Sequence, residues 1–361
     1  MPNIVVDISD LGLGHLAQTA PVLKRIAAIM PAANIIVRTR HRYECVREFF
    51  QVNFCRGEPI DDAQIFTIGP NGYDKLRTAN SFRKVHSNWD KKVDIETKRL
   101  MQYKPDIVLS NISYLSVAAA TRIDVPCICL CSINWLDFVR SYLPELDDDR
   151  AIRDTIAQCY RAAKLFIKPV PHMPMADLPN GRSIGPISRI GLDRRIDLRA
   201  HFRIPPGRKI ALVTFGGVSV TAPLQIPKMP DVVWIVQGDL AERRSDTITL
   251  TEVPYSFIDV VASVDLVIGK DSYGVVTEAA CNGVPLLILS RHGSMEADSL
   301  LKWASEVGGA ASYEGEFGKP GFDRAVSRIL ERPRPPRVGA TGIAQAADLI
   351  VSEAYAARGK M

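Results

Sequence analysis

Three turns that contain glycine carry many of the residues in this sequence that could do chemistry. They are Gly12-Leu-Gly-His-Leu-Ala17, Phe215-Gly-Gly217 and Gly269-Lys-Asp-Ser-Tyr-Gly274. Each turn follows a short apolar run of the kind found in buried parallel strands. Glycine lets the backbone approach a ligand closely, and the start of a following helix offers unpaired N–H donors to an anion.

The third turn shows this pattern most fully. In order, the stretch predicts a strand, a polar loop, a helix, a helix-ending pair and a second strand, at Leu266–Ile268, Gly269–Tyr273, Gly274–Cys281, Asn282-Gly283 and Pro285–Leu289. A helix N-terminus carries roughly half a positive charge, so the loop predicts an anion site. Glu278 lies one turn into the helix, where it suits a ligand that also has hydroxyl donors. A phosphate beside a ribose has both properties.

His15 is the candidate base of the first turn. A neutral imidazole at a helix start, with Gly14 on its N-terminal side to clear space, could accept a proton from an incoming hydroxyl. The alternative is that His15 only caps or packs the helix. The same turn matches G-x-G-x-x-A, so an NADP site with Arg38 or Arg40 on the 2′-phosphate is a further hypothesis. The spacer Ser9–Leu11 makes the turn looser than that fingerprint requires.

Three other segments follow predicted strand ends and could contact a ligand. Gly216 and Gly217 could approach it through backbone, Val253-Pro254-Tyr255 could flank a planar base, and Arg291-His-Gly-Ser-Met-Glu296 supplies a carboxylate and two cations. Each also has a plain structural explanation as a turn, a loop or surface charge.

Metal sites are not predicted. Asp147-Asp148-Asp149 could hold an ion as an Asp-x-Asp pair, but it precedes a helix beginning near Ala151, where acidic residues favour the first turn. Cys127, Cys129 and Cys131 alternate along one predicted strand, which is typical of buried small hydrophobes and not of a zinc site. No cofactor is expected from either group.

The elements that position these turns alternate between strands and helices. Predicted strands lie at 3–8, 34–37, 105–110, 126–130, 210–214, 232–236 and 247–250, and helices at about 14–30, 90–102 and 342–357. Such alternation predicts parallel, doubly wound sheets whose ligands bind at the carboxyl ends of the strands. We expect an N-terminal domain over 1–185, a linker over 186–207, a C-terminal domain over 208–340, and a terminal helix over 341–361 that packs back on the first domain.

The overall composition limits the classes of function. The chain has 361 residues, 47% apolar and 24% charged, as in ordinary two-domain globular proteins. A net charge of +5 permits acidic ligands or peripheral contact with anionic lipid, but does not indicate nucleic-acid binding. The sequence predicts no secretory signal and no membrane span. The seven cysteines are scattered, so no disulfide framework is predicted, and we expect a cytoplasmic protein.

These motifs resemble those of glycosyltransferases with the GT-B fold. The resemblance is to peptidoglycan N-acetylglucosaminyl transferases and to the glycosyltransferase-like domains fused to some sugar kinases. It rests on Gly12–His15, Phe215–Gly217 and Gly269–Pro285, with support from Pro105–Ser110, Ser132-Ile-Asn-Trp-Leu-Asp137 and Pro171-His-Met-Pro-Met175. It implies two Rossmann-like domains facing each other across a cleft, and a nucleoside-diphosphate sugar, with a UDP-sugar expected, held mainly by the C-terminal domain.

The resemblance also implies roles for particular residues. His15 would lie at the reacting carbon, and Glu278 would bind the ribose hydroxyls. The remaining nucleotide-sugar contacts would be Gly14, Gly216, Gly217, Val253, Tyr255, Lys270, Asp271, Ser272, Tyr273, Gly274, Thr277, Arg291, His292 and Glu296. The sequence departs from the family where Ala297 replaces the usual Gln after Glu296, and where Asn111 replaces an Asp, so an acid role at position 111 is lost.

The expected reaction is an inverting single displacement that needs no metal. Backbone donors at Tyr273–Gly274 would stabilise the departing diphosphate, and His15 would accept the proton of the acceptor's hydroxyl or amine. A nucleotide-sugar hydrolase or epimerase on the same scaffold is the main alternative. An NADP-dependent oxidoreductase is a third.

Overall fold

The computed structural model describes residues 1–68, 72–215, 223–290, 296–315 and 317–358. The chain divides into two compact units, residues 1–187 together with 341–361, and residues 188–340. The boundary therefore differs from the linker expected over 186–207. Residues from 188 onward belong to the second unit, where they include the short helix α8 (Arg195–His201).

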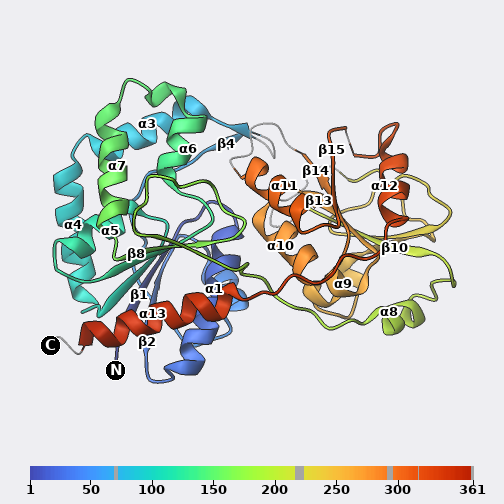
Figure 1. The fold of residues 1–361 in the computed structure, drawn as a ribbon, viewed down its shortest axis with the longest axis horizontal. Helices are drawn as coiled ribbons and strands as arrows, with labels where there is room; N and C mark the ends of the chain where they lie inside the picture. Colours follow the sequence, from blue (N-terminus) through green and yellow to red (C-terminus); the bar gives the residue numbers. More distant parts are fainter. Residues whose placement is uncertain (69–71, 216–222, 291–295, 316, 359–361) are drawn as a thin grey trace. The chain divides into compact units, whose positions relative to one another are not determined.

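The first unit contains a parallel sheet with helices on both faces (Figure 1). Its strand order is β3-β2-β1-β6-β7-β8-β9, and each neighbouring pair is parallel. A separate antiparallel pair is formed by β4 and β5. The elements are β1 (Asn3–Ile8), α1 (Gly14–Ile29), β2 (Asn34–Arg38), α2 (Tyr43–Phe50), β3 (Cys55–Arg56), β4 (Thr67–Ile68), β5 (Gly72–Tyr73), α3 (Lys75–His86), α4 (Trp89–Gln102), β6 (Ile107–Asn111), α5 (Tyr114–Thr121), β7 (Cys127–Leu130), α6 (Trp135–Tyr142), the 3₁₀ helix η1 (Pro144–Leu146), α7 (Arg150–Ala162), β8 (Leu165–Pro169), β9 (Gly181–Ile184) and α13 (Gly342–Arg358).

The strand order of this unit reverses between β1 and β6. These two strands are paired in the interior of the sheet, with Asp7 beside Ser110 and Ile8 beside Asn111. Reversal separates the connections that follow the two strands, which opens a crevice at their carboxyl ends. The turn that contains His15 follows β1, so the predicted strand and turn lie at the position where such sheets bind ligands.

The terminal helix α13 completes the first unit. It packs on α1 and contacts β6 and β9, and Figure 1 shows it crossing the sheet on the face opposite α4, α5 and α7. Ala346, Ala347, Ile350 and Ala354 are fully buried. Ala344, which the helical spacing places inward, is exposed. The buried stripe is therefore rotated from the expected one, because it includes Ala346 and Ala354.

The second unit also contains a doubly wound parallel sheet. Its strand order is β12-β11-β10-β13-β14-β15, with every neighbouring pair parallel. Besides α8, the elements are β10 (Lys209–Thr214), β11 (Val232–Val236), β12 (Thr247–Thr249), the 3₁₀ helix η2 (Leu250–Glu252), α9 (Phe257–Ser263), β13 (Leu266–Lys270), α10 (Tyr273–Cys281), β14 (Leu286–Leu289), α11 (Ala297–Glu306), β15 (Ala310–Tyr313) and α12 (Phe322–Leu330). The order reverses between β10 and β13, which is the position where sheets of this kind bind ligands.

Two glycines shape the strand–helix–strand segment around α10. A side chain at Gly269 would lie 2.7 Å from the Thr214 carbonyl oxygen, so β13 can pair this closely with β10 only through glycine. Gly283 has a φ of +65°, a left-handed conformation that favours glycine where a helix ends. The segment therefore has the strand, loop, helix and strand that its sequence predicts.

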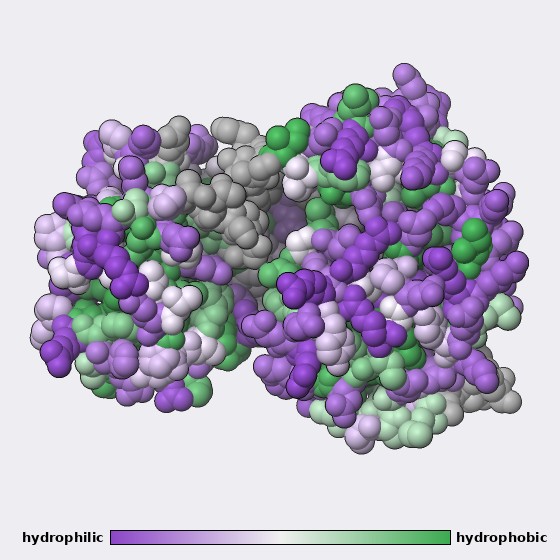
Figure 2. Space-filling model, turned by 180° about the vertical axis from the view of Figure 1, so that it is seen from behind, coloured by the Kyte–Doolittle hydropathy of each residue, from purple (hydrophilic) through white to green (hydrophobic). Residues whose placement is uncertain are grey.

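Hydrophilic side chains predominate on the face drawn in Figure 2, with smaller hydrophobic areas between them. The apolar residues of the strands lie inside the units; Ile4, Val5 and Val6 of β1 have no exposed surface. Within the described part of the chain, no helix is both long and apolar enough to cross a bilayer.

A buried set of charges joins β1, β2 and α4. The Nε atom of Arg38 lies 2.9 Å from Oδ1 of Asp7, and its Nη2 atom donates to Glu96. Ser116 donates from α5 to Oδ2 of Asp7, at 2.5 Å. Burial raises the pKa of Asp7 and of Glu96, and the nearby Arg38 charge opposes that rise.

We predict that Arg38→Met destabilises the first unit strongly. The substitution fills similar space but leaves two buried carboxylates without their cation, which costs about 3–5 kcal/mol in comparable cases. Urea unfolding followed by tryptophan fluorescence measures the change, with the exposed Arg25→Met as the control. A loss below about 1 kcal/mol, the usual scale of a surface ion pair, would contradict this account.

Candidate active site

His15 is the second residue of α1 and lies at the crevice of the first sheet. Its side chain is buried, with 5% of the residue exposed. Gly12 adopts a φ of +66° in the turn before it. A side chain added at Gly14 would meet no atom within 4 Å. The backbone on the N-terminal side of His15 is therefore open at Gly14.

Asn111 fixes the tautomer of His15. The Oδ1 atom of Asn111 lies 2.6 Å from Nδ1 of His15, while its Nδ2 atom donates to the Thr19 hydroxyl at 2.9 Å. An amide oxygen can only accept a hydrogen bond, so Nδ1 of the neutral ring carries the proton. The other nitrogen, Nε2, is then the basic one. Asn111 lacks the acid group of an Asp, as the sequence showed, but it still orients the imidazole.

The surroundings of His15 keep the ring neutral. Burial lowers its pKa from 6.5 to about 4, while the Asn111 hydrogen bond and Asp10 act in the opposite direction. Cys131 Sγ lies 3.7 Å from Nδ1, and the Trp135 ring centre lies 6.2 Å from that of the imidazole. At neutral pH the ring is therefore a base that has not yet taken up a proton.

The NADP hypothesis loses one of its two candidate cations. Arg38 is 1% exposed and is held by Asp7 and Glu96 inside the first unit, so it cannot reach a phosphate at the strand ends. Arg40 is exposed and contacts the Ile60 carbonyl and the Asp61 carboxylate.

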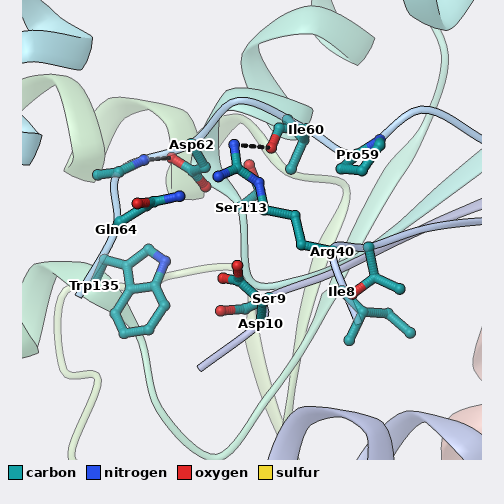
Figure 3. A pocket seen from close by; sticks show the side chains of 12 residues that line it. Ile8, Ser9, Asp10, Arg40, Pro59, Ile60, Asp62, Gln64, Ser113 and Trp135 are labelled. Atoms are coloured by element: carbon teal, nitrogen blue, oxygen red, sulfur yellow. Dashed lines mark hydrogen bonds between the residues drawn. The ribbon is translucent and has the colours of Figure 1, made fainter. Parts of the chain in front are cut away.

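A pocket opens beside the ends of β1 and β2 in the first unit. Figure 3 shows Asp10, Arg40, Asp62, Gln64 and Trp135 around it. Its other lining residues are Ile8, Ser9, Thr39, Pro59, Ile60, Ala63 and Ser113. The loop at 57–64 supplies much of the lining, and the sequence analysis did not predict this. Trp135, the first residue of α6, lines the pocket from the other side.

The second unit carries the predicted anion loop at the end of β13. Lys270 ends the strand, Asp271 is 1% exposed, and Ser272 is the N-cap residue of α10 with an extended backbone. A side chain at Gly274 would meet no atom within 4 Å, so the first turn of α10 is open at that point. Tyr273 is buried, with 5% exposed.

Glu278 is paired with Arg189. The Arg189 Nε and Nη2 atoms lie 2.8 and 2.6 Å from Oε1 of the carboxylate, which is about 10% exposed. Burial raises the pKa of Glu278, and the Arg189 charge opposes the rise. The guanidinium also lies over the Phe257 ring, 5.9 Å from its centre. The sequence placed Arg189 in a linker, so this partner was missed.

The other predicted contact residues differ in how available they are. Thr277 has no exposed surface, and its hydroxyl donates to the Tyr273 carbonyl at 2.8 Å, so its side chain supports α10. Val253 is 8% exposed, whereas Tyr255 is half-buried beneath Arg194. Glu296 is the N-cap residue of α11. Gly216, Gly217, Arg291 and His292 lie outside the described residues.

The acidic triplet lies at a helix start, as predicted. Asp149 immediately precedes α7 and its Oδ2 atom is 2.9 Å from Nε of Arg83. Asp147 pairs with Arg153 at 3.3 Å. Cys127, Cys129 and Cys131 are buried thiols. In the described part of the chain, no group of three His, Cys, Asp or Glu residues is placed to hold a metal ion.

The chain has the GT-B glycosyltransferase fold. It is similar to a glycotransferase of kitacinnamycin (TM-score 0.62, 15% identity, 99% of this chain and 96% of the other). It is also similar to a UDP-glucosyltransferase from Polygonum tinctorium that can glucosylate indoxyl (TM-score 0.59, 12% identity, 99% and 94%). A putative UDP-N-acetylglucosamine 2-epimerase from Listeria monocytogenes shares the architecture (TM-score 0.55, 13% identity, 97% and 96%).

Comparison of the sequence itself gives a more distant relative. The chain is 23% identical over 209 residues to an L-arabinokinase of Arabidopsis thaliana, and the match covers 55% of this chain. It spans only 19% of the length of that kinase. No protein-family model matches the chain. The predicted likeness to a GT-B glycosyltransferase is confirmed, and these identities establish the fold alone.

We predict that Asn111→Asp raises the pKa of His15. A carboxylate in place of the amide would put a negative charge next to Nδ1 and favour the imidazolium. Proton and nitrogen NMR titration should find the His15 pKa near 4 in the native protein, rising toward 6.5 or above in the variant. His15→Gln identifies the signal, and the exposed His201 serves as an internal control. An unchanged His15 pKa would show that position 111 does not govern the ring.

Proposed function

We propose that this protein is a glycosyltransferase that moves a sugar from a nucleoside-diphosphate sugar, with UDP as the expected nucleotide, to a hydroxyl or amine acceptor. The pairing of His15 with Asn111 carries the proposal. It supplies a neutral base at the crevice of a GT-B sheet, with Nδ1 occupied and Nε2 basic. The likeness to a UDP-glucosyltransferase supports the choice of donor.

The proposed reaction is a single displacement with inversion. The acceptor oxygen or nitrogen forms a bond to the anomeric carbon while the bond from that carbon to the diphosphate oxygen breaks on the opposite face. The acceptor proton passes to Nε2 of His15, and the nucleoside diphosphate leaves with the bonding electron pair. A base positioned in this way typically contributes about 10²–10⁴ in rate.

The second unit would bind the leaving group. The open first turn of α10 at Gly274 offers backbone N–H donors to the diphosphate, whose negative charge grows as the bond breaks. Lys270 ends the neighbouring strand and would add a positive charge. Glu278 would accept hydrogen bonds from the ribose hydroxyls through Oε2, since the contacts with Arg189 involve Oε1. The backbone N–H groups of α10 and the Lys270 ammonium are assigned the role that a metal ion plays in other transferases. Activity should therefore survive EDTA.

A nucleotide-sugar epimerase or hydrolase is the second candidate, because a putative UDP-N-acetylglucosamine 2-epimerase has the same architecture. Neither reaction needs an acceptor other than water. Incubation with the nucleotide sugar alone separates the candidates. Rapid release of free or epimerised sugar without an acceptor would favour the second candidate and overturn the transferase.

We predict that nucleoside diphosphates stabilise the protein against heat, UDP most strongly. Glu278→Gln should weaken UDP binding about tenfold or more, since it removes a charged hydrogen-bond acceptor. Thermal shift with a panel of diphosphates, followed by calorimetry, measures both effects. The exposed Glu331→Gln on the same unit is the matched control. Equal affinity in the two variants would move the nucleotide site away from α10.

We predict that His15→Gln reduces transfer by about 10²–10⁴ while leaving nucleotide affinity unchanged. The native enzyme should also keep its base as the pH falls below 6.5. Because the pKa of His15 is lowered to about 4, the neutral form persists above that value and is lost only as the pH approaches it. A pH–rate profile of kcat measures this. Loss of rate with a midpoint at 6.5 that His15→Gln abolishes would contradict the predicted environment.

A further inference from the structure

The pocket at the ends of β1 and β2 shares structure with the His15 site. Ser9, which lines the pocket, donates its backbone N–H to the Asn111 carbonyl at 2.7 Å. Trp135 also lines it, and its ring centre is 6.2 Å from that of His15. A molecule in this pocket would therefore lie close to the residues that position the imidazole.

The loop at 57–64, which forms one wall of the pocket, is held in place by contacts within the first unit. Gly57 donates to the Val37 carbonyl at 2.9 Å, and the Gln64 backbone donates to the Ser81 hydroxyl at 2.8 Å. Between them, Asp61 pairs with Lys92 and with Arg40. A wall fixed at both ends and in the middle loses little entropy on binding.

The lining is rich in groups that recognise hydroxyls. Asp10 and Asp62 supply carboxylates, and Gln64 supplies both a donor and an acceptor. The Asp62 carboxylate is held by the Ala63 N–H at 2.8 Å and by the Ser113 side chain. Figure 3 shows Gln64 between Asp62 and the indole of Trp135, with Asp10 and Ser9 opposite. Ile8, Pro59 and Ile60 supply the apolar part of the lining.

The charged side chains of the lining disfavour anions. Two carboxylates line the pocket against one cation, Arg40, which is already engaged by Asp61 and the Ile60 carbonyl. Burial raises the pKa of Asp62 to about 6, so at neutral pH this carboxylate is ionised. An incoming phosphate or carboxylate would meet that charge at close range, whereas a neutral hydroxyl would donate to it.

We propose that this pocket binds the acceptor, and that the acceptor is a small, uncharged, hydroxyl-rich molecule such as a monosaccharide or a cyclic polyol. Asp62 and Gln64 bind adjacent hydroxyls, and Trp135 forms a wall that lies beside His15. The assignment as acceptor rests on the proposed function, whereas the binding chemistry does not.

Binding to the full chain, without any nucleotide sugar, tests the proposal. Saturation-transfer NMR on a panel of neutral sugars and cyclic polyols, their uronic acids, their phosphates and flat phenols should detect the neutral polyols. Asp62→Asn should weaken their binding about 10- to 100-fold, as expected for loss of a charged hydrogen-bond partner. Gln64→Leu should also weaken it. In the described part of the chain the Gln64 side chain makes no hydrogen bond to the protein, and the bond to Ser81 uses its backbone. The Gln64→Leu variant should therefore fold even if Asp62→Asn does not.

Asp90→Asn is the matched control, since Asp90 is 89% exposed on α4 and pairs with the partly exposed Arg122. Preferential binding of phosphates, uronic acids or phenols, or equal affinity in Asp62→Asn and Asp90→Asn, would overturn the proposal. Polyol binding with no sugar transfer would retain this pocket and refute the transferase. Transfer to phenols with no polyol binding would retain the transferase and refute the assignment of this pocket.

Discussion

The first unit depends on a guanidinium buried between two carboxylates. Asp7 and Arg38 are direct neighbours in the register of β1 and β2, and Glu96 reaches them from α4. Three buried ions are stable only in a geometry that pairs them, because each misplacement leaves a charge unpaired. The next residues along these strands, from Ser9 and Thr39 onward, line the pocket. The charges inside the sheet therefore fix the starting points of the loops that would bind substrate.

Both candidate sites contain a buried group whose partner comes from far along the chain. His15 is oriented by Asn111, and Glu278 by Arg189, across 96 and 89 residues. The two pairs differ in their demands on a ligand. Burial keeps His15 neutral and the bond to Asn111 orients it, without any contact from a ligand. At Glu278, Arg189 already donates to one of the two carboxylate oxygens. A ribose bound there would share that carboxylate with Arg189, so the affinity for nucleotide would reflect the strength of an existing ion pair as well as the new contacts.

The sequence was sufficient for the parallel strands, since buried apolar runs such as Leu266–Ile268 have few other uses in a chain of this composition. It was also sufficient for the turn at His15 and for the start of α10. It could not reveal the contact of Asn111 with His15. The predicted strand places Asn111 at the carboxyl edge of the sheet, but it does not show which side chain Asn111 contacts there. Arg189 looked like a linker residue because prolines and arginines around it lack periodicity. The pocket loop at 57–64 has no regular pattern, and tertiary contacts alone fix its form.

The helix α13 gives the chain an order of assembly. Ala346, Ala347 and Ile350 fill a groove against α1, yet they are synthesised after all of residues 188–340. During translation the face of α1 that α13 covers has no partner until the end of the chain is made, whereas the second unit is continuous in sequence. The first unit can therefore be completed only after the second unit has been synthesised. Shortening the chain by one helix would leave its beginning, and not its end, incomplete.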